Sequence, residues 1–423
     1  MKILNKIYTS SIQVKLLNVI NYLIVLYAFF LPLSYYVNKN IFFIILILLF
    51  FIKDIKERLK ITLQNKVIQA IIILYSIHIL WLIGTQDFHT AFVKIGSVKL
   101  LLYAIIFVSL IENKFKYTII YALLAAIMLS EITSYLIFFQ IINPINNATI
   151  IDPVPFMVSH TVYTIFLAIG VGIIIFNILN HKSKNKILFF LQIFFLITIT
   201  MNIFIISSRL GYILYFSVLF FIVLYNIRKN LIKVLITLTL ISSILFSFAY
   251  TQINNFHNRI DLMGSSLIKA INNQDYTSSF GVRIGLHKYS FDLIKEYPLF
   301  GVGTGDHLQE VEKIVKHSKD KDNKLLTNIF HAGSGGGLHS DYLDFTVQFG
   351  IIGFLAFLNI FYQLYKQKQN DIYLRNIQIL LIIVFLINAI PSQMVYLGSL
   401  NQLFIVLLSV TLVPSTRKGP NAL

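Results

Sequence analysis

Continuous apolar runs separated by short polar connections cover most of this chain. A transmembrane helix needs about 20 predominantly apolar residues, and most of the runs approach or reach that length. Twelve runs can be counted, over residues 16–36, 38–52, 67–84, 91–111, 117–140, 159–179, 187–207, 210–227, 232–250, 343–365, 376–392 and 398–414. Because the runs are continuous rather than alternating, a transmembrane β-barrel is excluded. The pattern predicts an all-α polytopic membrane protein with about twelve spans.

One long polar stretch, residues 251–342, interrupts this pattern between the ninth and tenth runs. A segment of this length is rarely plain coil, and apolar residues recur in it at helical spacing. We expect helices over residues 254–271, 280–297 and 309–317, and the second of these should bury Val282, Leu286, Tyr289 and Leu293. The chain therefore divides into a first membrane bundle over residues 1–250, a large helical loop over 251–342, and a second membrane part with a tail over 343–423.

Lysine and arginine are concentrated in alternate connections, which include the N-terminus, residues 53–66, residues 366–375 and the tail. The short connections between them contain only Lys39 and Arg209. By the positive-inside rule, both termini are expected in the cytoplasm. The polar stretch then lies outside, together with the connections at residues 140–160, at Arg209 and at Ser392.

Composition narrows the possible function classes. Only 13% of the residues are charged, against roughly 25% in soluble domains, and 57% are hydrophobic. A net charge of +17 would suggest nucleic acid in a soluble protein, but here the basic residues follow the topology, so no nucleic-acid partner is expected. The chain has no cysteine, which excludes disulfides, thiolate metal sites and cysteine nucleophiles.

Two arginines are candidates for binding an anion. Arg209 stands at the outer end of a span between Ser208 and Gly211, where a phosphate could approach closely. An arginine in hydrocarbon costs roughly 2.5–3.5 kcal/mol on insertion scales, so it needs either a route to the interface or an anionic partner. Arg283 falls in the first turn of a predicted helix, which favours anions, although a solvated surface arginine fits that position equally well. If the two arginines meet in space, they form a clamp for a diphosphate.

The run from Tyr297 to Gly305 contains three alternating glycines, Gly301, Gly303 and Gly305. Alternating glycines can turn successive backbone amides toward one point and so form an anion-binding nest. A turn-rich connector is the other interpretation. A nucleotide P-loop is excluded, because no Gly-Lys-Ser/Thr follows the glycines.

The start of the tenth run supplies a candidate base. His339 precedes Ser340 and Asp341, either of which can cap the helix that follows. The helix dipole disfavours an imidazolium at that end, and a neutral imidazole is suited to accept a proton near pH 7. A structural role is the alternative for any single histidine, and His307 and His331 are weaker candidates of the same type.

Two lysines, a glycine-rich segment and an apparent metal motif also bear on the predicted chemistry. Lys94 and Lys99 lie in the outer half of the fourth span, where they either reach the interface or add positive charge to the outer cavity. The glycines of residues 333–337 predict a hinge or lid before His339. Residues 320–322 match the Asp-x-Asp metal motif of nucleotide-sugar transferases, but the surrounding lysines would repel a divalent cation, so a solvated charge run is expected. The histidines also lack the spacing of a zinc site.

Together these features resemble the O-antigen ligases, with the related O-antigen polymerases and O-oligosaccharyltransferases. The resemblance covers the whole hydropathy plan, including one large loop near the C-terminus. The local motifs are Ser208-Arg209-Leu210-Gly211, the loop arginine Arg283, the run from Tyr297 to Gly305, and His339-Ser340-Asp341-Tyr342-Leu343 followed by Gly350-Ile351-Ile352-Gly353. Family members often have asparagine after the histidine, whereas this chain has Ser340, which leaves ligase and polymerase both open.

The resemblance implies a metal-independent, inverting glycosyltransferase of the bacterial inner membrane that uses no cofactor. Its donor would be a glycan on undecaprenyl (polyprenyl) diphosphate, and its acceptor either the lipid A-core, for a ligase, or another lipid-linked repeat, for a polymerase. Arg209 and Arg283 would bind the leaving diphosphate, and His339 would take the proton of the acceptor hydroxyl. The expected substrate-binding residues are Ser208, Gly301, Gly303, Gly305, Asp341 and Lys99.

Transfer to protein hydroxyls and transport of lipid-linked sugars are the remaining alternatives. Transporters usually show internal repeats and broken helices near the middle of the membrane. This sequence shows neither and concentrates its polar residues outside. The ligase is therefore the preferred hypothesis, with its active site on the periplasmic face.

Overall fold

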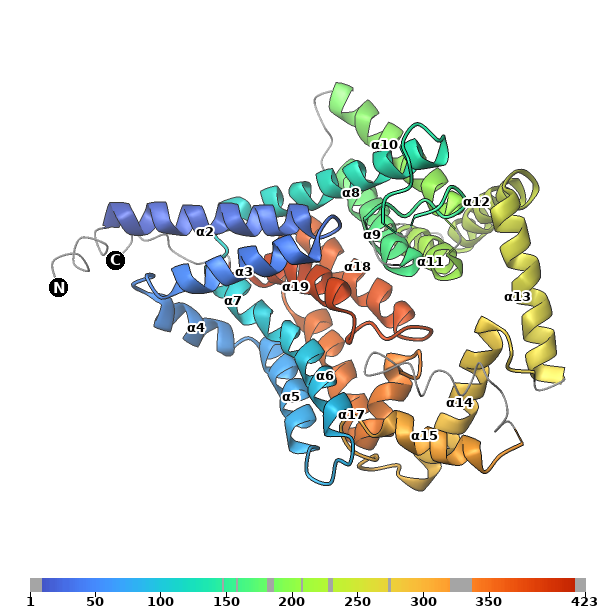
Figure 1. Cartoon of the computed structure of the whole chain (residues 1–423). Coiled ribbons are helices and arrows are strands. Elements are labelled where there is room, and N and C mark those ends of the chain that lie inside the picture. The colour runs from blue at the N-terminus through green and yellow to red at the C-terminus, as the bar shows by residue number, and fades with distance from the viewer. Residues whose placement is uncertain are drawn as a thin grey trace.

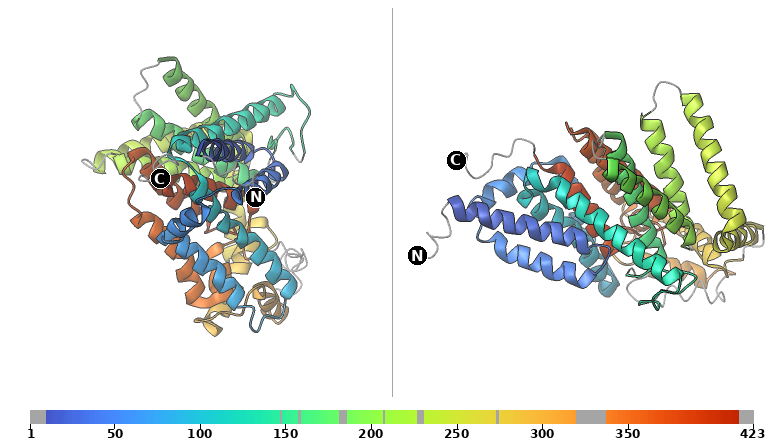
Figure 2. Two further views of the ribbon diagram at one scale, coloured as in Figure 1. Left: turned by 90° about the vertical axis from the view of Figure 1, so that its left-hand side faces the viewer. Right: turned by 90° about the horizontal axis from the view of Figure 1, so that it is seen from above.

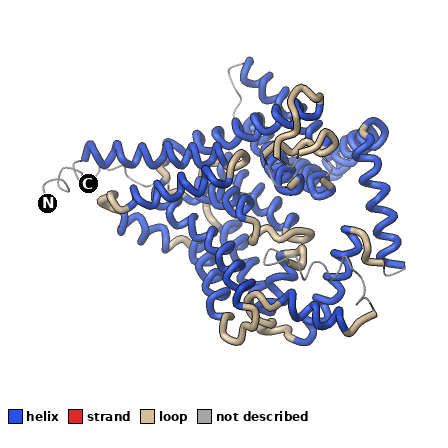
Figure 3. Tube along the Cα trace, viewed as in Figure 1, coloured by secondary structure: helices blue, strands red, loops and turns tan. Residues whose placement is uncertain are grey.

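The computed structural model describes residues 10–146, 148–156, 159–180, 186–206, 208–226, 231–272, 275–319 and 337–414. Within these ranges the regular elements are all helices, and Figure 3 shows no strand among them. The prediction of an all-α protein is confirmed.

A helix occupies each of the twelve apolar runs. These helices are α2 (Ser10–Phe30), α3 (Tyr35–Leu49), α5 (Lys66–Leu80), α6 (Phe88–Val98) continued by η1 (Lys99–Leu102) and α7 (Tyr103–Leu110), α8 (Lys116–Phe138) preceded by η2 (Asn113–Phe115), α9 (His160–Asn180), α10 (Lys186–Ile205), α11 (Arg209–Asn226), α12 (Leu231–Gln252), α17 (Asp341–Lys366), α18 (Ile372–Asn388) and α19 (Gly398–Leu412). One further helix, α4 (Ile55–Leu63), lies in a connection between two runs and meets α5 at an angle of 82°.

Length separates these helices into two groups. Within the described ranges, six helices are long and apolar enough to cross a membrane, and α4 with α5 adds a seventh if the bent pair counts as one span. The helices α3, α11, α18 and α19 are apolar but shorter. A helix of 15 residues, such as α3, is only about 22 Å long, less than the ~30 Å of a bilayer's hydrocarbon core. The structure is that of a multi-pass membrane protein, and the count of twelve spans stays a prediction.

Polar connections that are far apart in the sequence meet at two places, one near α4 and one near α15 (Figure 1). At the α15 end, the carboxylate of Asp306 accepts hydrogen bonds from the backbone amides of Gln86 and Asp87. At the α4 end, the side chain of Asn65 donates a hydrogen bond to Gln367 Oε1 over 3.2 Å. The connections at residues 53–66 and 366–375, both rich in lysine and arginine, thus meet at the α4 end, and the partition of the other connections stays a prediction. Which end faces the cytoplasm stays a prediction.

Three helices form in the polar stretch, and they confirm the three that its apolar spacing predicts. They are α13 (Asn254–Asn272), α14 (Ser279–Glu296) and α15 (His307–Lys316). In Figure 1, α13 runs along the right-hand side from α12 to α14, and α14 and α15 lie against the start of α17. The polar stretch thus folds back onto the end of the membrane bundle.

The predicted buried face of α14 is also confirmed, since its four apolar residues, Val282, Leu286, Tyr289 and Leu293, are at most 3% exposed. They form a hydrophobic cluster of their own with residues of α15, α17 and the turn before it, namely Leu308, Val311, Val315, Leu338, Leu343 and Val347. Because this cluster is packed on the first turns of α17, it fixes α14 beside the segment that carries His339.

A strap, residues 297–305, crosses α17 at the point where that helix is broken. Gly350 interrupts α17 with φ +63° and ψ −157°, and the amide of Ile351 donates to a strap carbonyl over 2.9 Å. Gly301 of the strap has φ +67°, and a Cβ atom there would lie 2.4 Å from the carbonyl carbon of Gln348. Backbone meets backbone at both positions, so only glycine fits.

Gly350→Ala is expected to destabilise the protein by roughly 2–5 kcal/mol. A left-handed conformation costs a non-glycine residue about 1–2 kcal/mol, and forcing a methyl group into packed atoms costs about 1–3 kcal/mol more. The new Cβ would lie 2.2 Å from the carbonyl carbon of Leu299. Thermal unfolding of the purified protein measures the effect, with Gly96→Ala as the matched control, because nothing lies within 4 Å of a Cβ at that position. Equal melting temperatures for the two variants would contradict this account of the strap.

Candidate functional site

Arg209 is the first residue of α11, and a buried serine fixes the start of that helix. Ser208 is 1% exposed, and its Oγ accepts a hydrogen bond from the Gly211 amide over 3.2 Å and lies 2.9 Å from Thr164 Oγ1. A Cβ atom on Gly211 would lie 2.6 Å from Thr164 Cβ, so α11 and α9 are in close contact there. Ser208 and Gly211 therefore serve helix packing, and these contacts give no support to a substrate-binding role for Ser208.

Three arginines from three helices gather near the start of α11. Electrostatic repulsion links Arg209 to Arg259 of α13 and to Arg283 of α14. The Nε atoms of Arg209 and Arg283 are buried without a hydrogen-bond partner. No ion pair within the described ranges involves any of the three guanidinium groups. Like charges without a counter-ion destabilise one another, so this group is suited to hold a ligand that carries more than one negative charge.

His339 lies in the turn before α17, and its backbone is in the left-handed region at φ +55°. The pKa of its imidazole is lowered from 6.5 to about 4, mainly by burial and then by the nearby Arg283, His287 and Lys94. The imidazole is therefore neutral at neutral pH. The physical cause is burial beside positive charge, rather than the helix dipole on which the sequence-based argument relied.

Arg259 and His287 are residues of this site that the sequence analysis missed. His287 follows Arg283 by one helical turn and shares its face of α14, where burial and then Arg283 lower the pKa of its imidazole. One ring nitrogen of His287 is hydrogen-bonded to the backbone of Leu338, and Nε2 is buried without a partner. The sequence shows that His287 shares a helix face with Arg283 and that Arg259 has no acidic residue three or four positions away, but neither pattern indicates which face is turned to the site.

The strap glycines do not form the predicted anion-binding nest, because their amides are already used within the protein. The amides of Gly303 and Gly305 donate to the backbone and side-chain oxygens of Gln348, over 3.0 and 2.9 Å respectively. The amides of the other three residues, Gly301, Val302 and Thr304, each donate to a backbone carbonyl. The strap therefore ties α17 to its neighbours, and no amide of residues 301–305 is left for an anion.

Asp341 and Lys99, two more of the predicted substrate-binding residues, have other surroundings. Asp341 is fully buried, and its carboxylate accepts hydrogen bonds from the amides of Met394 over 2.8 Å and Val395 over 3.3 Å. It therefore holds the turn between α18 and α19.

Lys99 is exposed, whereas Lys94, earlier in the same span, is 2% exposed and acts electrostatically on the predicted base. The structure thus places Lys94, and not Lys99, near His339.

His307 is the first residue of α15 and is fully buried, with its Nε2 3.3 Å from Asp344 Oδ1. Burial lowers the pKa of His307 well below its usual value, so it belongs to the polar interior rather than to an open site. His331, the motif at residues 320–322 and the glycine-rich residues 333–336 lie outside the described residues.

The arrangement combines a cluster of positive charges with a neutral proton acceptor. Arg209, Arg259 and Arg283 can hold a multiply charged anion, and His339 lies within electrostatic range of Arg283. Among the residues that the structure describes, no group of three or more histidine, aspartate or glutamate side chains is arranged to hold a metal ion. The site can therefore bind an anionic leaving group next to a base that removes a proton.

A comparison with protein families agrees with this chemistry. Residues 193–358 match the family model described as O-antigen ligase, and no curated protein matches the chain. The matched segment runs from α10 through the polar stretch into α17, so it contains Arg209, Arg283 and His339. The family carries out glycosyl transfer of the O-antigen ligase or polymerase type on lipid-linked glycans in a membrane. Over residues 193–358, the segment that contains these three residues, the chain is similar to the O-antigen ligase family.

Proposed function

We propose that this protein is an O-antigen ligase, which transfers a glycan from undecaprenyl (polyprenyl) diphosphate to the lipid A-core at the periplasmic face of the bacterial inner membrane. The observation that carries the proposal is the group of three arginines, without ion-pair partners in the described ranges, close to a neutral and half-buried histidine. A diphosphate supplies the negative charge that the arginines lack. Transfer of a sugar to a hydroxyl group needs a proton acceptor, and His339 provides one.

In the proposed reaction, the acceptor hydroxyl attacks the anomeric carbon on the face opposite to the diphosphate. A new C–O bond forms while the bond between the anomeric carbon and the phosphate oxygen breaks, so the configuration is inverted. The electron pair leaves with the diphosphate, whose growing charge Arg209 and Arg283 stabilise. The hydroxyl proton passes to His339, and the products are the extended lipid A-core and polyprenyl diphosphate.

Donor binding also prepares the base. In the free protein, burial together with the charges of Arg283 and Lys94 lowers the pKa of His339 to about 4, where an imidazole is a weak base. A diphosphate bound at the arginines offsets part of this positive charge. The pKa of His339 then rises toward the range in which a histidine accepts a proton efficiently. The base is therefore strongest when the donor is in place.

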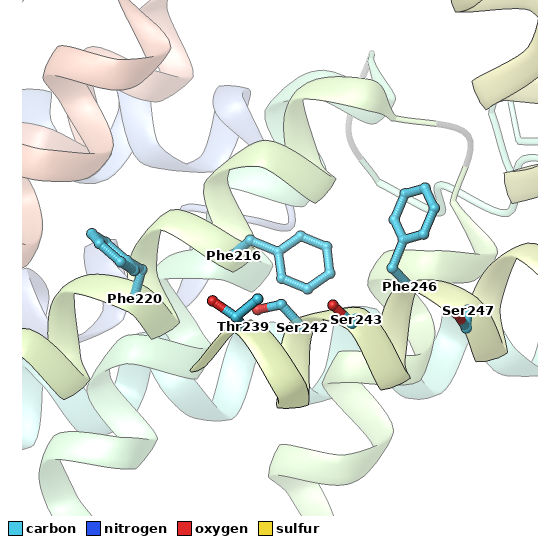
Figure 4. A pocket seen from close by; sticks show the side chains of 7 residues that line it. All are labelled: Phe216, Phe220, Thr239, Ser242, Ser243, Phe246 and Ser247. Atoms are coloured by element: carbon cyan, nitrogen blue, oxygen red, sulfur yellow. The ribbon is translucent and has the colours of Figure 1, made fainter. Parts of the chain in front are cut away.

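A groove between α11 and α12 fits the lipid chain of the donor. Its volume is about 510 Å³, and it is lined by Phe216 and Phe220 of α11 and by five residues of α12 (Figure 4): Thr239, Ser242, Ser243, Phe246 and Ser247. Figure 2 shows the two helices side by side at one edge of the molecule. Because α11 begins at Arg209, Phe216 lies about 10 Å from that arginine along the helix. A lipid chain in the groove would place its diphosphate beside the arginines.

The lipopolysaccharide of a strain that lacks this protein tests the proposal. We expect unmodified lipid A-core together with polymer that accumulates on the lipid carrier, and we expect the wild-type gene to restore the modified core. Core that carries a single repeat unit would identify a polymerase. Unmodified core with the donor retained in the cytoplasmic leaflet would identify a transporter. Either of these two outcomes overturns the proposal.

A further inference from the structure

A lysine and two aspartates are buried together where α6 meets the first turn of α17. Lys94 is 2% exposed, and Asp341 and Asp344 are fully buried. The ammonium group is attracted to both carboxylates. An ionisable side chain at membrane depth costs about 2.5–3.5 kcal/mol on insertion scales, so such groups generally mark a functional site. The proposed transfer reaction uses neither aspartate, and it uses Lys94 only through the effect of its charge on His339.

The ammonium group of Lys94 is held in place by the turn between α18 and α19. Its Nζ lies 4.2 Å from the ring centre of Tyr396, a favourable cation–π distance. The hydroxyl of Tyr396 is hydrogen-bonded to His78 Nε2 over 3.0 Å and to Gln348 Nε2 over 3.2 Å. Tyr396 is therefore anchored to α5 through His78 and to α17 through Gln348, and its ring holds the ammonium group of Lys94 in the interior.

Asp344 connects this buried charge group to the turn that carries His339. Its Oδ1 accepts a hydrogen bond from the backbone amide of Leu338 over 3.3 Å and lies 3.3 Å from His307 Nε2. Its Oδ2 accepts a hydrogen bond from the side-chain amide of Gln393. Leu338 is the residue immediately before His339, so one carboxylate ties the interior directly to the backbone of the predicted base.

The backbone of His339 needs such support, because its φ of +55° is left-handed. That conformation costs a residue with a Cβ about 1–2 kcal/mol and persists only where the surroundings hold it. Before His339, the backbone of Leu338 makes two such contacts. Its amide donates a hydrogen bond to Asp344, and its backbone is hydrogen-bonded to the His287 ring. After His339, the hydroxyl of Ser340 donates to a carbonyl of the turn after α18 over 3.1 Å. These contacts together set the direction of the imidazole.

We propose that Asp344, with its charge balanced by Lys94, is a positioning residue for His339, an inference that rests on the transfer function proposed above. The carboxylate holds the Leu338 amide and, through it, the left-handed turn from which the imidazole reaches the arginine group. Without this hydrogen bond, the turn can relax to a right-handed or extended backbone and carry the imidazole away from the acceptor hydroxyl.

Lys94 has a second effect, because its charge acts on the imidazole as well as on Asp344. The charged and titratable groups that act on His339 are Arg283 and His287 from α14 and Lys94 from α6. Each of these groups lowers the pKa of the His339 imidazole. Removing the charge of Lys94 therefore makes it easier for His339 to take up a proton.

The first test compares two replacements of Asp344 in the purified full-length protein in lipid vesicles. Asp344→Ala removes the acceptor for the Leu338 amide and is expected to lower kcat by about 10²-fold with the donor KM unchanged, because a misplacement of ~1 Å can cost that much. Asp344→Asn keeps an acceptor oxygen and is expected to retain most of the kcat. The control is Glu131→Gln, a 2% exposed carboxyl group in α8, which should leave both constants unchanged.

The second test uses the pH dependence of kcat/KM, which a purely structural role would not alter. The double variant Lys94→Met/Asp344→Asn removes one positive and one negative charge together, so the net charge of the buried group is unchanged. Asp341 keeps its hydrogen bonds from the amides of Met394 and Val395, and the variant is therefore expected to fold. Loss of the Lys94 charge raises the pKa of His339, so the acid limb of the profile is expected to move to higher pH. Lys94→Arg keeps the charge and should leave the acid limb in place.

The outcomes separate this inference from the transfer mechanism. A folded Asp344→Ala variant with wild-type kcat overturns the positioning role of Asp344. An acid limb of the double variant that coincides with the wild-type limb overturns the effect of Lys94 on His339. If Asp344→Ala does not fold, Lys94→Met/Asp344→Ala takes its place, because it removes the acceptor of the Leu338 amide and the lysine charge together. If His339→Asn is itself fully active, the transfer mechanism fails instead, because the base is then a different group.

Discussion

Replacing His339 by asparagine is expected to lower glycan transfer by about 10²–10⁴-fold, because a positioned general base contributes that much to the rate. Asparagine tolerates the left-handed backbone at φ +55°, so this variant removes the base and keeps the turn. The rate of transfer at saturating donor and acceptor, with the purified protein in lipid vesicles, measures the effect. Donor affinity is expected to stay near the wild-type value, since the imidazole is not part of the diphosphate clamp.

His317→Ala is the matched control for this prediction. His317 is exposed at the end of α15, and its Nδ1 lies 2.8 Å from the carbonyl of Lys313 in its own turn. Its loss should leave the transfer rate unchanged at the same protein level. Wild-type activity in His339→Asn, or an equal decrease in both variants, would rule out His339 as the base.

Replacing Arg283 by methionine is expected to lower kcat by about 10²–10³-fold, the usual effect of removing one group that stabilises a developing negative charge. Arg283→Lys keeps the charge but loses the planar fork that binds two phosphate oxygens at once, so an intermediate rate is expected. Steady-state kinetics with the lipid-linked donor give kcat and the donor KM for each variant. A rise in KM with unchanged kcat would instead place Arg283 in ground-state binding alone.

Arg375→Met serves as the control, because Arg375 is similarly half-buried but lies at the α4 end of the bundle. Its guanidinium donates to the carbonyls of Gln367 and Tyr365 and not to the proposed site. The two arginine variants should differ strongly in kcat and little in protein level. Equal kinetics for Arg283→Met and Arg375→Met would contradict the diphosphate clamp.

The helices of the polar stretch could be predicted from the sequence because their signal is local. The spacing of Val282, Leu286, Tyr289 and Leu293 marks one face of a helix whatever that face packs against. The same holds for the apolar runs, whose length and continuity need no knowledge of their neighbours. The number of spans could not be derived in this way, since α3, α18 and α19 are short enough that their course through a bilayer depends on the helices around them.

The site was predictable in part. Arg209, Arg283 and His339 stand out because each is a polar residue at the start or end of an apolar or helical segment, where it needs a partner. Arg259 and His287 were missed, because their role appears only when α13 and α14 fold back beside α11 and α17. A charged residue on an amphipathic helix gives no sign by itself that it faces a site rather than solvent.

Ser208, Asp341 and the strap glycines show what a sequence does not reveal about its polar groups. The sequence shows that a hydroxyl, carboxylate or amide is present, but it does not show whether a distant segment already satisfies it. Asp341 is bonded to amides more than 50 residues further along the chain. Gly305 donates to Gln348, and Ser208 is bonded to Thr164. Each of these groups is used in packing, whereas the Nε atoms of Arg209 and Arg283 are buried without a hydrogen-bond partner.

The sequence by itself determined that this is an all-helical membrane protein with one polar stretch, and it predicted two arginines and a histidine as the residues that carry the chemistry. Those conclusions follow from segment length, periodicity and the cost of a charge in hydrocarbon, all of which act over a few turns of chain. Only the tertiary structure decided that Arg259 and His287 join them and that Lys94 and Asp344 lie beneath the turn of His339. Electrostatic coupling depends on distance in space, and the folding of the polar stretch onto α17 sets that distance.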